Sequence, residues 1–345
     1  MVNDMTKIEF EQGKMAVDPR VRRYLWPSRL VWSTQDNAAP HNPEGLLSST
    51  GGPCVMEHKG NAQGLLVDFG RQIHGGIQIE HGINQDHTPV PVRVRFGESV
   101  SEAMGEPNND HAVHDQVTHV PWYGTAEIGN TGFRFARIDM VKPGTRLEIK
   151  KLRAVFLYRD LEYKGSFRCS DERLNQIWNT GAYTVHLCMQ DMLWDGIKRD
   201  RLVWLGDMHP ETMVINTVFG ENEIVPASLD FVRNQTPLPA WMNGISSYSL
   251  WWVLIQHCWH LYHGNRDYLE QQRKYLFELL ALLRTQIADD NAERLGEARF
   301  LDWPSSEDKT AIHAGLHALL CMALRAGAEL CGILSNPQEQ TACQQ

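Results

Sequence analysis

One segment, Trp194–Asp207, concentrates side chains that could do acid–base chemistry. It contains three aspartates, Asp195, Asp200 and Asp207. Like charges close together raise the pKa of a carboxyl group, whereas adjacent cations lower it. Carboxyl groups whose pKa values differ in this way can take separate acid and base roles. The segment is therefore a candidate catalytic loop, and the cations among its aspartates are Lys198, Arg199 and Arg201.

A purely structural interpretation of this segment is also open. Asp207 could cap the helix that periodicity predicts from residue 208, because Asp is a favoured N-cap residue. Arg199, Asp200 and Arg201 could form a solvated run of ion pairs, which contributes little to stability. Composition alone favours this interpretation over catalysis.

The elements before this loop read as strands. From Gly51 to Tyr163, short runs of residues alternate between apolar and polar and are punctuated by Gly, Pro and Asn. This pattern predicts half-buried antiparallel strands in a β-sandwich. Gly75-Gly76 and Pro143-Gly144 are interpreted as turns. The expected strands cover residues 65–69, 76–80, 90–96, 133–140, 147–151 and 154–158.

The hydrophobic period changes at Ser170, a candidate N-cap residue. An apolar stripe through Leu174, Ile177, Trp178 and Tyr183 predicts a first helix. Helical spacing also predicts helices near 208–219, 247–263, 267–288 and 309–334. Strands followed by helices normally form separate domains. We expect an N-terminal arm over residues 1–48, with a possible edge strand at 29–33, a β-sandwich domain over 49–163 and a helical domain over 164–345.

Composition narrows the class of partner. The chain has 345 residues and a formal net charge of −9, which argues against nucleic acid or a membrane surface and favours a neutral ligand. Its seven cysteines are scattered without a CxxC pair, which predicts reduced thiols in the cytoplasm. We find no apolar signal segment and expect no stretch near the length of a membrane span. The sequence contains no Gly-rich phosphate-binding loop, so we expect no cofactor.

Two further groups of residues have a structural and a functional interpretation. Six of the eleven tryptophans lie between Trp194 and Trp259. They could pack in a core or stack on a sugar, because ligand pockets are often lined with aromatic rings. His257, His260 and His263 could in principle bind a metal, but their spacing drifts around the helix, so we expect a packed helix and no metal site.

The order of residues in the candidate loop resembles the signature of the inverting α-L-rhamnosidases. Asp195 is followed after four residues by Asp200-Arg201, then by Trp204 and Gly206-Asp207. The resemblance extends to other segments of the sequence: Val67–Arg71, Val94–Glu98, Gly132–Arg137, Gly165–Trp178 and Asp302-Trp303.

This resemblance implies a jelly-roll-like antiparallel β-sandwich followed by part of an (α/α)6 toroid, with the sugar in the mouth of the toroid. Asp200 would be the general acid, at a position where the family usually has Glu. The partner would be a rhamnose-containing oligosaccharide or glycoside, and neither cofactor nor metal is implied. The residues expected to bind the sugar are Asp195, Arg199, Trp204, Asp207 and Trp303.

The general base of the family lies late in the toroid, and we cannot assign it. Helical periodicity supplies only about five or six helices after Ser170. We therefore expect a truncated chain that is inactive or incomplete by itself. Its last helices should leave an apolar face uncovered, which favours self-association. The side chains expected on that face are Leu279, Leu280, Leu283, Leu316, Leu319 and Leu320.

Two functions other than catalysis stay open at this point. The chain could be a non-catalytic carbohydrate-binding protein, whose two domains recognise a sugar without cleaving it. It could also contain a helical domain that only packs against a partner protein.

Overall fold

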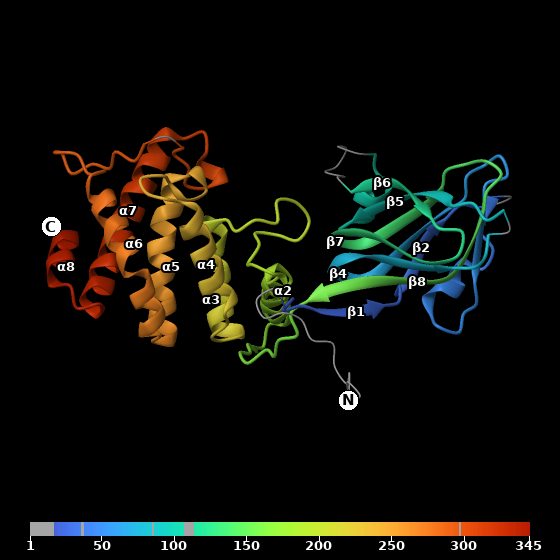
Figure 1. Cartoon of the computed structure of the whole chain (residues 1–345), viewed down its shortest axis with the longest axis horizontal. Coiled ribbons are helices and arrows are strands. Elements are labelled where there is room, and N and C mark those ends of the chain that lie inside the picture. The colour runs from blue at the N-terminus through green and yellow to red at the C-terminus, as the bar shows by residue number, and fades with distance from the viewer. Residues whose placement is uncertain (1–16, 36–37, 85, 107–113, 297) are drawn as a thin grey trace, which may run out of the picture. The chain divides into compact units, whose positions relative to one another are not determined.

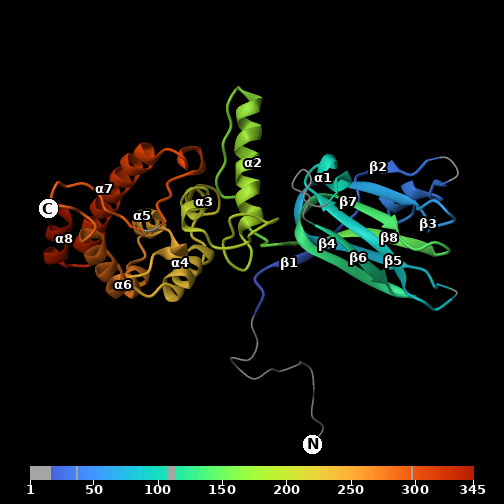
Figure 2. The ribbon, with the colours of Figure 1, turned by 90° about the horizontal axis from the view of Figure 1, so that it is seen from above.

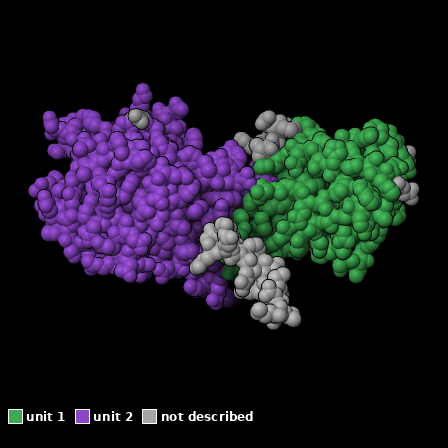
Figure 3. All heavy atoms as spheres, viewed as in Figure 1, with its two compact units in different colours: residues 1–130, 134–160 green, residues 131–133, 161–345 purple. Residues whose placement is uncertain are grey.

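The computed structural model describes residues 17–35, 38–84, 86–106, 114–296 and 298–345. The chain divides into two compact units, residues 1–130 with 134–160 and residues 161–345 with 131–133 (Figure 3). Strands build the first unit and helices build the second (Figure 1). We call them the sheet unit and the helical unit. An antiparallel sheet followed by a helical region is the coarse order that the sequence predicts.

The sheet unit is built on eight strands in the order β1-β8-β4-β7-β5-β6, with β2 paired to β4 and β3 paired to β8. Apolar residues that alternate along the strands form its core, as in β5, where Val90, Val92 and Val94 are buried. The strands are β1 (Val21–Leu25), β2 (Arg29–Ser33), β3 (Cys54–Glu57), β4 (Gly64–His81), β5 (Val90–Gly97), β6 (Asp115–Val120), β7 (Gly124–Met140) and β8 (Arg146–Tyr158).

The predicted turn at Gly75-Gly76 is wrong, because both glycines lie inside the continuous strand β4. A Cβ atom on Gly75 would lie 2.0 Å from the carbonyl oxygen of Val155, and the φ angle of Gly75 is +140°. Glycine therefore serves a close approach between β4 and β8 here. The predicted turn at Pro143-Gly144 is confirmed between β7 and β8.

Part of the predicted arm belongs to the sheet. β2 occupies the expected edge-strand segment and pairs with β4, and β1 pairs with β8. Residues 1–16 of the arm lie outside the described residues. The strand pattern did not predict the short helix α1 (Val100–Met104), whose N-cap residue Ser99 accepts a hydrogen bond from the Glu102 N–H.

A buried carboxylate holds β4 to its neighbours. The Asp68 side chain is 1% exposed, and its carboxyl oxygens lie 2.9 Å from Arg29 Nη2 and 2.8 Å from Arg134 Nε. Burial by itself would raise the pKa of Asp68, but hydrogen bonds from Arg134, the Gly70 N–H and Arg29 lower it below the usual value. Asp68 is thus held as a carboxylate whose negative charge is balanced by two guanidinium groups.

The helical unit begins at α2, and its helices α3 to α7 lie beside one another (Figure 2). The four later helices predicted from spacing are confirmed as α3, α5, α6 and α7, whereas α4 was not predicted. The predicted N-cap Ser170 is wrong by one residue, since Asp171 caps α2 by accepting from the Arg173 N–H. The helices are α2 (Glu172–Cys188), α3 (Leu205–Val218), α4 (Ile224–Gln235), α5 (Ser246–His263), α6 (Arg266–Arg284), α7 (Lys309–Ile333) and α8 (Pro337–Gln344).

The apolar face expected to be uncovered on the last helices is buried. α7 packs against α5, α6 and α8, which cover its apolar side. Gly327 permits this packing, because a Cβ atom there would lie 2.4 Å from Leu280 Cδ2. Trp252 and Trp259 on α5 are buried in the same core, so these two tryptophans are structural. The leucines that contradict the expectation are Leu279, Leu280, Leu283, Leu316, Leu319 and Leu320, each at most 3% exposed.

Two expectations about apolar helices need correction. α7 is long and apolar enough to cross a membrane by length and composition, contrary to the expected absence of such a stretch. However, 56% of its apolar window is buried inside the protein, as in a core helix.

On α2, Leu174 and Ile177 are exposed, so the predicted stripe is not a buried face in its first two turns. Burial on α2 is concentrated towards its C-terminal end.

Candidate active site

The loop between α2 and α3 carries Asp200, the predicted general acid, and Asp195, a predicted sugar-binding residue. The Asp195 N–H donates to the Leu202 carbonyl oxygen over 3.0 Å, and the Leu202 N–H donates to Asp195 Oδ1 over 2.9 Å. This double link closes the neck of a loop whose tip exposes Arg199 and Asp200. Arg201 completes the turn with a left-handed φ of 57°, and its guanidinium lies 6.0 Å from the centroid of the Trp194 ring. Asp200 is therefore exposed to solvent at the tip of a loop whose two ends are held together by hydrogen bonds.

The segment between this loop and α3 is fixed by one side chain. Asn243 Oδ1 accepts a hydrogen bond from the Leu205 N–H over 3.2 Å, and Asn243 Nδ2 donates to the Val203 carbonyl oxygen over 3.0 Å. Trp204, between them, is the N-cap residue of α3. The alternative in which Asp207 caps this helix is therefore wrong. Asp207 lies in the first turn, where the helix dipole favours a negative charge.

Gly206 allows an aromatic ring to approach the start of α3. A Cβ atom at this position would lie 2.7 Å from Cε1 of Tyr248, which comes from α5. The ring of Trp204 meets Tyr248 edge to face, with centroids 6.0 Å apart. The Trp204 and Gly206 positions of the signature thus bring α5 against the carboxylate loop.

Electrostatic interactions show that the aspartates share one region. Burial raises the pKa of Asp195, and the charge of Asp200 adds to the rise. Asp207 retains solvent access, yet desolvation of its carboxyl by the surrounding protein raises its pKa, followed by the charge of Asp195. Burial raises the pKa of Tyr248 to about 12, and the negative charge of Asp207 contributes. Raised pKa values of this kind cluster at functional sites, which makes this region a candidate site.

Sequence reasoning missed Glu211, a buried acid one turn after Asp207 on α3. Burial raises its pKa well above the usual value, and the charges of Asp207 and Asp195 add to the rise. The Cys188 thiol at the end of α2 donates a hydrogen bond to the Glu211 carboxylate, which lowers the pKa only slightly against these effects. The i, i+4 spacing from Asp207 places both acids on one helix face and could have identified it.

Trp303 lies in a different loop, before α7. Its ring is 79% exposed and meets Phe300 edge to face at 5.2 Å. The preceding Asp302 accepts a hydrogen bond from the Trp303 N–H over 2.7 Å, and its charge raises the pKa of Asp207. The structure therefore groups Asp195, Asp200, Asp207 and Trp204, and links Trp303 to them through Asp302.

The histidines considered as metal ligands have separate partners. His257 Nε2 lies 2.7 Å from Glu329 Oε2 on α7, and His263 Nε2 lies 2.9 Å from Asn216 Oδ1 on α3. Among the residues that the structure describes, no group of three or more His, Cys, Asp or Glu side chains could hold a metal ion.

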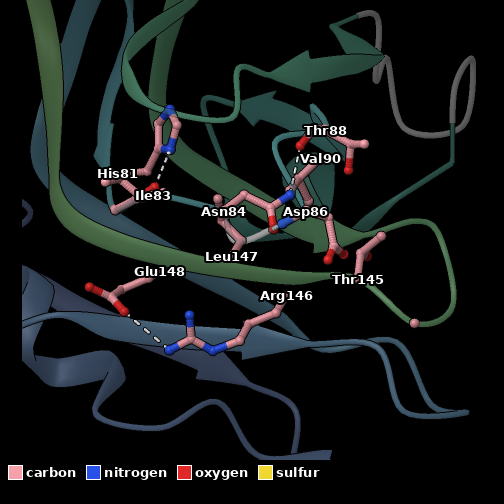
Figure 4. A pocket seen from close by; sticks show the side chains of 12 residues that line it. His81, Ile83, Asn84, Asp86, Thr88, Val90, Thr145, Arg146, Leu147 and Glu148 are labelled. Carbon is pink, nitrogen blue, oxygen red and sulfur yellow. Dashed lines mark hydrogen bonds and ion pairs between the residues drawn. The ribbon is translucent and has the colours of Figure 1, made fainter.

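The sheet unit contains a pocket of about 410 Å³ (Figure 4). Figure 4 shows Arg146 and Glu148 paired on one side of this pocket, with Asn84 and Asp86 on another. None of the site residues predicted from the sequence lines it.

Most glycoside hydrolases act through a pair of Asp or Glu carboxyl groups, so a cluster of aspartates is compatible with this class of enzyme. The family model described as the bacterial alpha-L-rhamnosidase 6 hairpin glycosidase domain matches residues 162–343. The chain therefore belongs to the bacterial α-L-rhamnosidase family, which confirms the resemblance predicted from the sequence.

Individual relatives agree with this assignment. The chain is 33% identical to an alpha-L-rhamnosidase of Formosa agariphila over 78 residues, which are 23% of this chain and 8% of that protein. A GH78 family rhamnosidase of Bacillus sp. GL1 aligns with a TM-score of 0.71 and 21% identity, over 87% of this chain and 33% of that one. A rhamnosidase from Klebsiella oxytoca with rhamnose bound has a TM-score of 0.74 and 18% identity, over 94% and 69%. The structural matches show a shared fold, and this chain spans only part of each relative.

Proposed function

We propose that this chain forms the sugar-binding part of an inverting hydrolase of terminal α-L-rhamnosides, built from a β-sandwich and part of an (α/α)6 toroid. The observation that carries the proposal is the group of Asp195, Asp200 and Asp207, whose acids share one electrostatic environment. It lies within the segment that the rhamnosidase family model matches. Rhamnose bound to the relative from Klebsiella oxytoca supports the same sugar for this chain.

In this proposal Asp200 is the general acid that protonates the glycosidic oxygen. Its exposed position on the loop tip gives it access to a substrate. Asp is one methylene shorter than Glu, so the loop must bring its backbone nearer to the sugar than a Glu would require. General acid catalysis of this kind contributes about 10²–10⁴-fold to the rate.

Asp195 and Asp207 bind sugar hydroxyl groups in the proposal. The carboxyl of Asp195 accepts backbone hydrogen bonds from the Leu202 and Arg201 N–H groups, which fix its orientation. A carboxylate held in this way can accept hydrogen bonds from a sugar without first paying the entropy of ordering. Trp204 and Trp303 supply apolar surfaces for the sugar ring, and Arg199 lies at the exposed loop tip beside Asp200.

Inversion requires a second carboxylate about 6.5–9.5 Å from the acid, to activate water on the opposite face of the sugar. Among the described residues, we assign the aspartates next to Asp200 to the sugar hydroxyls, and Glu211 is buried. We therefore expect residues 1–345, assayed alone, to bind rhamnose but to hydrolyse rhamnosides slowly or not at all. Fast turnover of an aryl α-L-rhamnoside by monomeric material would contradict this expectation.

The proposal is tested by titrating the purified chain with L-rhamnose and following tryptophan fluorescence and binding heat. Trp303→Ala should weaken binding by up to about 1.5–3 kcal/mol, because the exposed ring would become buried against the sugar. The matched control is Trp122→Ala, which removes an exposed tryptophan from the sheet unit. D-Glucose serves as the control sugar.

Rhamnose binding that is weakened by Trp303→Ala and unaffected by Trp122→Ala supports the proposal. Absence of rhamnose binding, or equal affinities in Trp204→Ala, Trp303→Ala and the wild type, would contradict a sugar-binding role for these two tryptophans.

A further inference from the structure

Two cysteines meet where α8 packs against α7. Cys331 on α7 is fully buried and Cys343 on α8 is 7% exposed. The Cys331 thiol donates a hydrogen bond to the sulfur of Cys343. Both thiols are free, so the pair is present as a dithiol. Two thiols that interact in this way can be joined by a disulfide when their helices bring the sulfurs to bonding distance.

A guanidinium group from a third helix completes this cluster. Arg284 Nη1 at the end of α6 lies 3.2 Å from Cys343 Sγ and 3.0 Å from Glu339 Oε2. Glu339 precedes Cys343 by one turn of α8, so the carboxylate orients the guanidinium towards the sulfur. The cluster therefore contains a donor thiol from α7, a cation from α6 and an anion from α8.

These contacts favour the thiolate form of Cys343. The hydrogen bond from Cys331, together with Arg284, lowers the pKa of the Cys343 thiol to about 7, although burial and Glu339 oppose the shift. The hydrogen bond to Cys343, together with burial, raises the pKa of Cys331. The buried Cys54 shows the opposite behaviour to Cys343, because burial without a cation raises its pKa to about 12. Thiolates beside cations are the nucleophilic cysteines of proteins.

We propose that Cys343 and Cys331 form a redox-active dithiol, in which Cys343 attacks a hydroperoxide and Cys331 resolves the product into a disulfide. The Cys343 thiolate attacks one peroxide oxygen and the O–O bond breaks, which leaves a sulfenic acid and hydroxide. The Cys331 sulfur then attacks the sulfenic sulfur, the S–O bond breaks and water leaves with the thiol proton. Overall, two thiols are oxidised to a disulfide and one hydrogen peroxide is reduced to two waters.

The slight exposure of Cys343 limits the oxidant to a small molecule, so hydrogen peroxide is the probe. The reduced full chain is treated with an equimolar amount, and the sites of oxidation are mapped by mass spectrometry after blocking the remaining thiols. We expect a Cys331–Cys343 disulfide that dithiothreitol reverses. In Cys331→Ser the reaction should stop at a sulfenic acid on Cys343, which dimedone traps.

Two substitutions separate thiolate activation from simple access. Arg284→Gln should slow oxidation of Cys343 about tenfold at pH 7, because the thiol then returns towards the ordinary pKa near 8.5. Arg273→Gln is the matched control, since Arg273 also extends from α6 and donates to the Leu334 carbonyl oxygen at the end of α7. Cys321→Ser removes an exposed thiol of α7 and should leave the dithiol reaction unchanged.

A second measurement keeps the proposal testable if Arg284→Gln does not fold. In the wild type, the rate of Cys343 alkylation by iodoacetamide should reach half its maximum near pH 7. The proposal is overturned if peroxide oxidises the exposed Cys321 while Cys331 and Cys343 stay reduced. It is also overturned if Arg284→Gln and Arg273→Gln react equally fast.

Discussion

Asp68 in the sheet unit and Glu211 in the helical unit are both buried carboxyl groups, but their surroundings differ. Asp68 faces two guanidinium groups, and its pKa is lowered. Glu211 faces a thiol and two aspartates, and its pKa is raised. Burying a carboxylate with cations stabilises a fold only if all of its hydrogen bonds are satisfied, whereas uncompensated acids lower stability and serve chemistry. The comparison separates an acid that holds strands together from a buried acid whose charge is not balanced by cations and that lies near the proposed site.

The largest effect should follow from removing the proposed general acid. Asp200→Asn should lower the rate of rhamnoside hydrolysis by about 10²–10⁴-fold in any version of the protein that is active, and leave folding unchanged. The loss should be smaller for a rhamnoside with a very good leaving group, because such a group needs less protonation. Rates measured on both substrates test this, and equal losses on both would remove Asp200 from the acid role.

In the sheet unit, the largest effect should be on stability. Asp68→Asn should lower the free energy of unfolding by about 2–3 kcal/mol, because it leaves Arg29 and Arg134 without their buried partner. Denaturant titration measures the loss. The control is Glu80→Gln, which removes the partly exposed pair with Lys151 and should cost at most about 1 kcal/mol.

The pH dependence of the same variant has a definite sign. The pKa of Asp68 is lowered on folding. Its contribution to the free energy of unfolding is therefore fully present above the unfolded-state pKa near 3.9, and it is lost as the pH falls through the lower folded-state pKa. Asp68→Asn should therefore unfold with less acid sensitivity in that range. Identical acid unfolding curves would show that the arginine cluster does not determine this behaviour.

A glycine pair sharpens the comparison within the helical unit. Gly206→Ala places a methyl group against the Tyr248 ring and should cost about 1–3 kcal/mol as an overpacked position. Gly196→Ala, in the loop before α3, is the control, since a Cβ atom there would meet no atom within 4 Å. Thermal unfolding of the two variants compares them, and equal melting temperatures would mean that Tyr248 moves aside without cost.

The smallest effect is expected from Glu211→Gln, which keeps the shape of the buried acid. Below pH 4 the change in stability should stay within about 1 kcal/mol, because the acid is neutral in both states. As the pH rises from the unfolded pKa through the raised folded pKa, the wild type should lose stability and the variant should not. Melting temperatures from pH 4 to 8 measure the difference, and parallel curves would contradict an uncompensated Glu211.

Much of the fold follows from local periodicity. The change from alternation to helical spacing at Ser170 correctly separates strands from helices, and spacing predicts α5 and α7 almost to the residue. α4 was missed, although its buried residues, among them Ile224, Val225 and Leu229, follow the helical period. Gly75-Gly76 was interpreted as a turn because glycine pairs usually mark turns, whereas the close approach of β8 is visible only in three dimensions.

The sequence by itself determined the family, the candidate site loop and the periods of the two units, because each depends on residue order over a short span. Only the tertiary structure decided which acids have their charge balanced by cations and which lie near other acids. Asp68 meets Arg134 across 66 residues, and Asp302 acts on Asp207 from a distant loop. It also decided that Leu316 and its neighbours are covered and that Cys343 faces Arg284. Burial and Coulomb interactions depend on what surrounds a side chain, and neighbours that are distant along the chain cannot be read from local order.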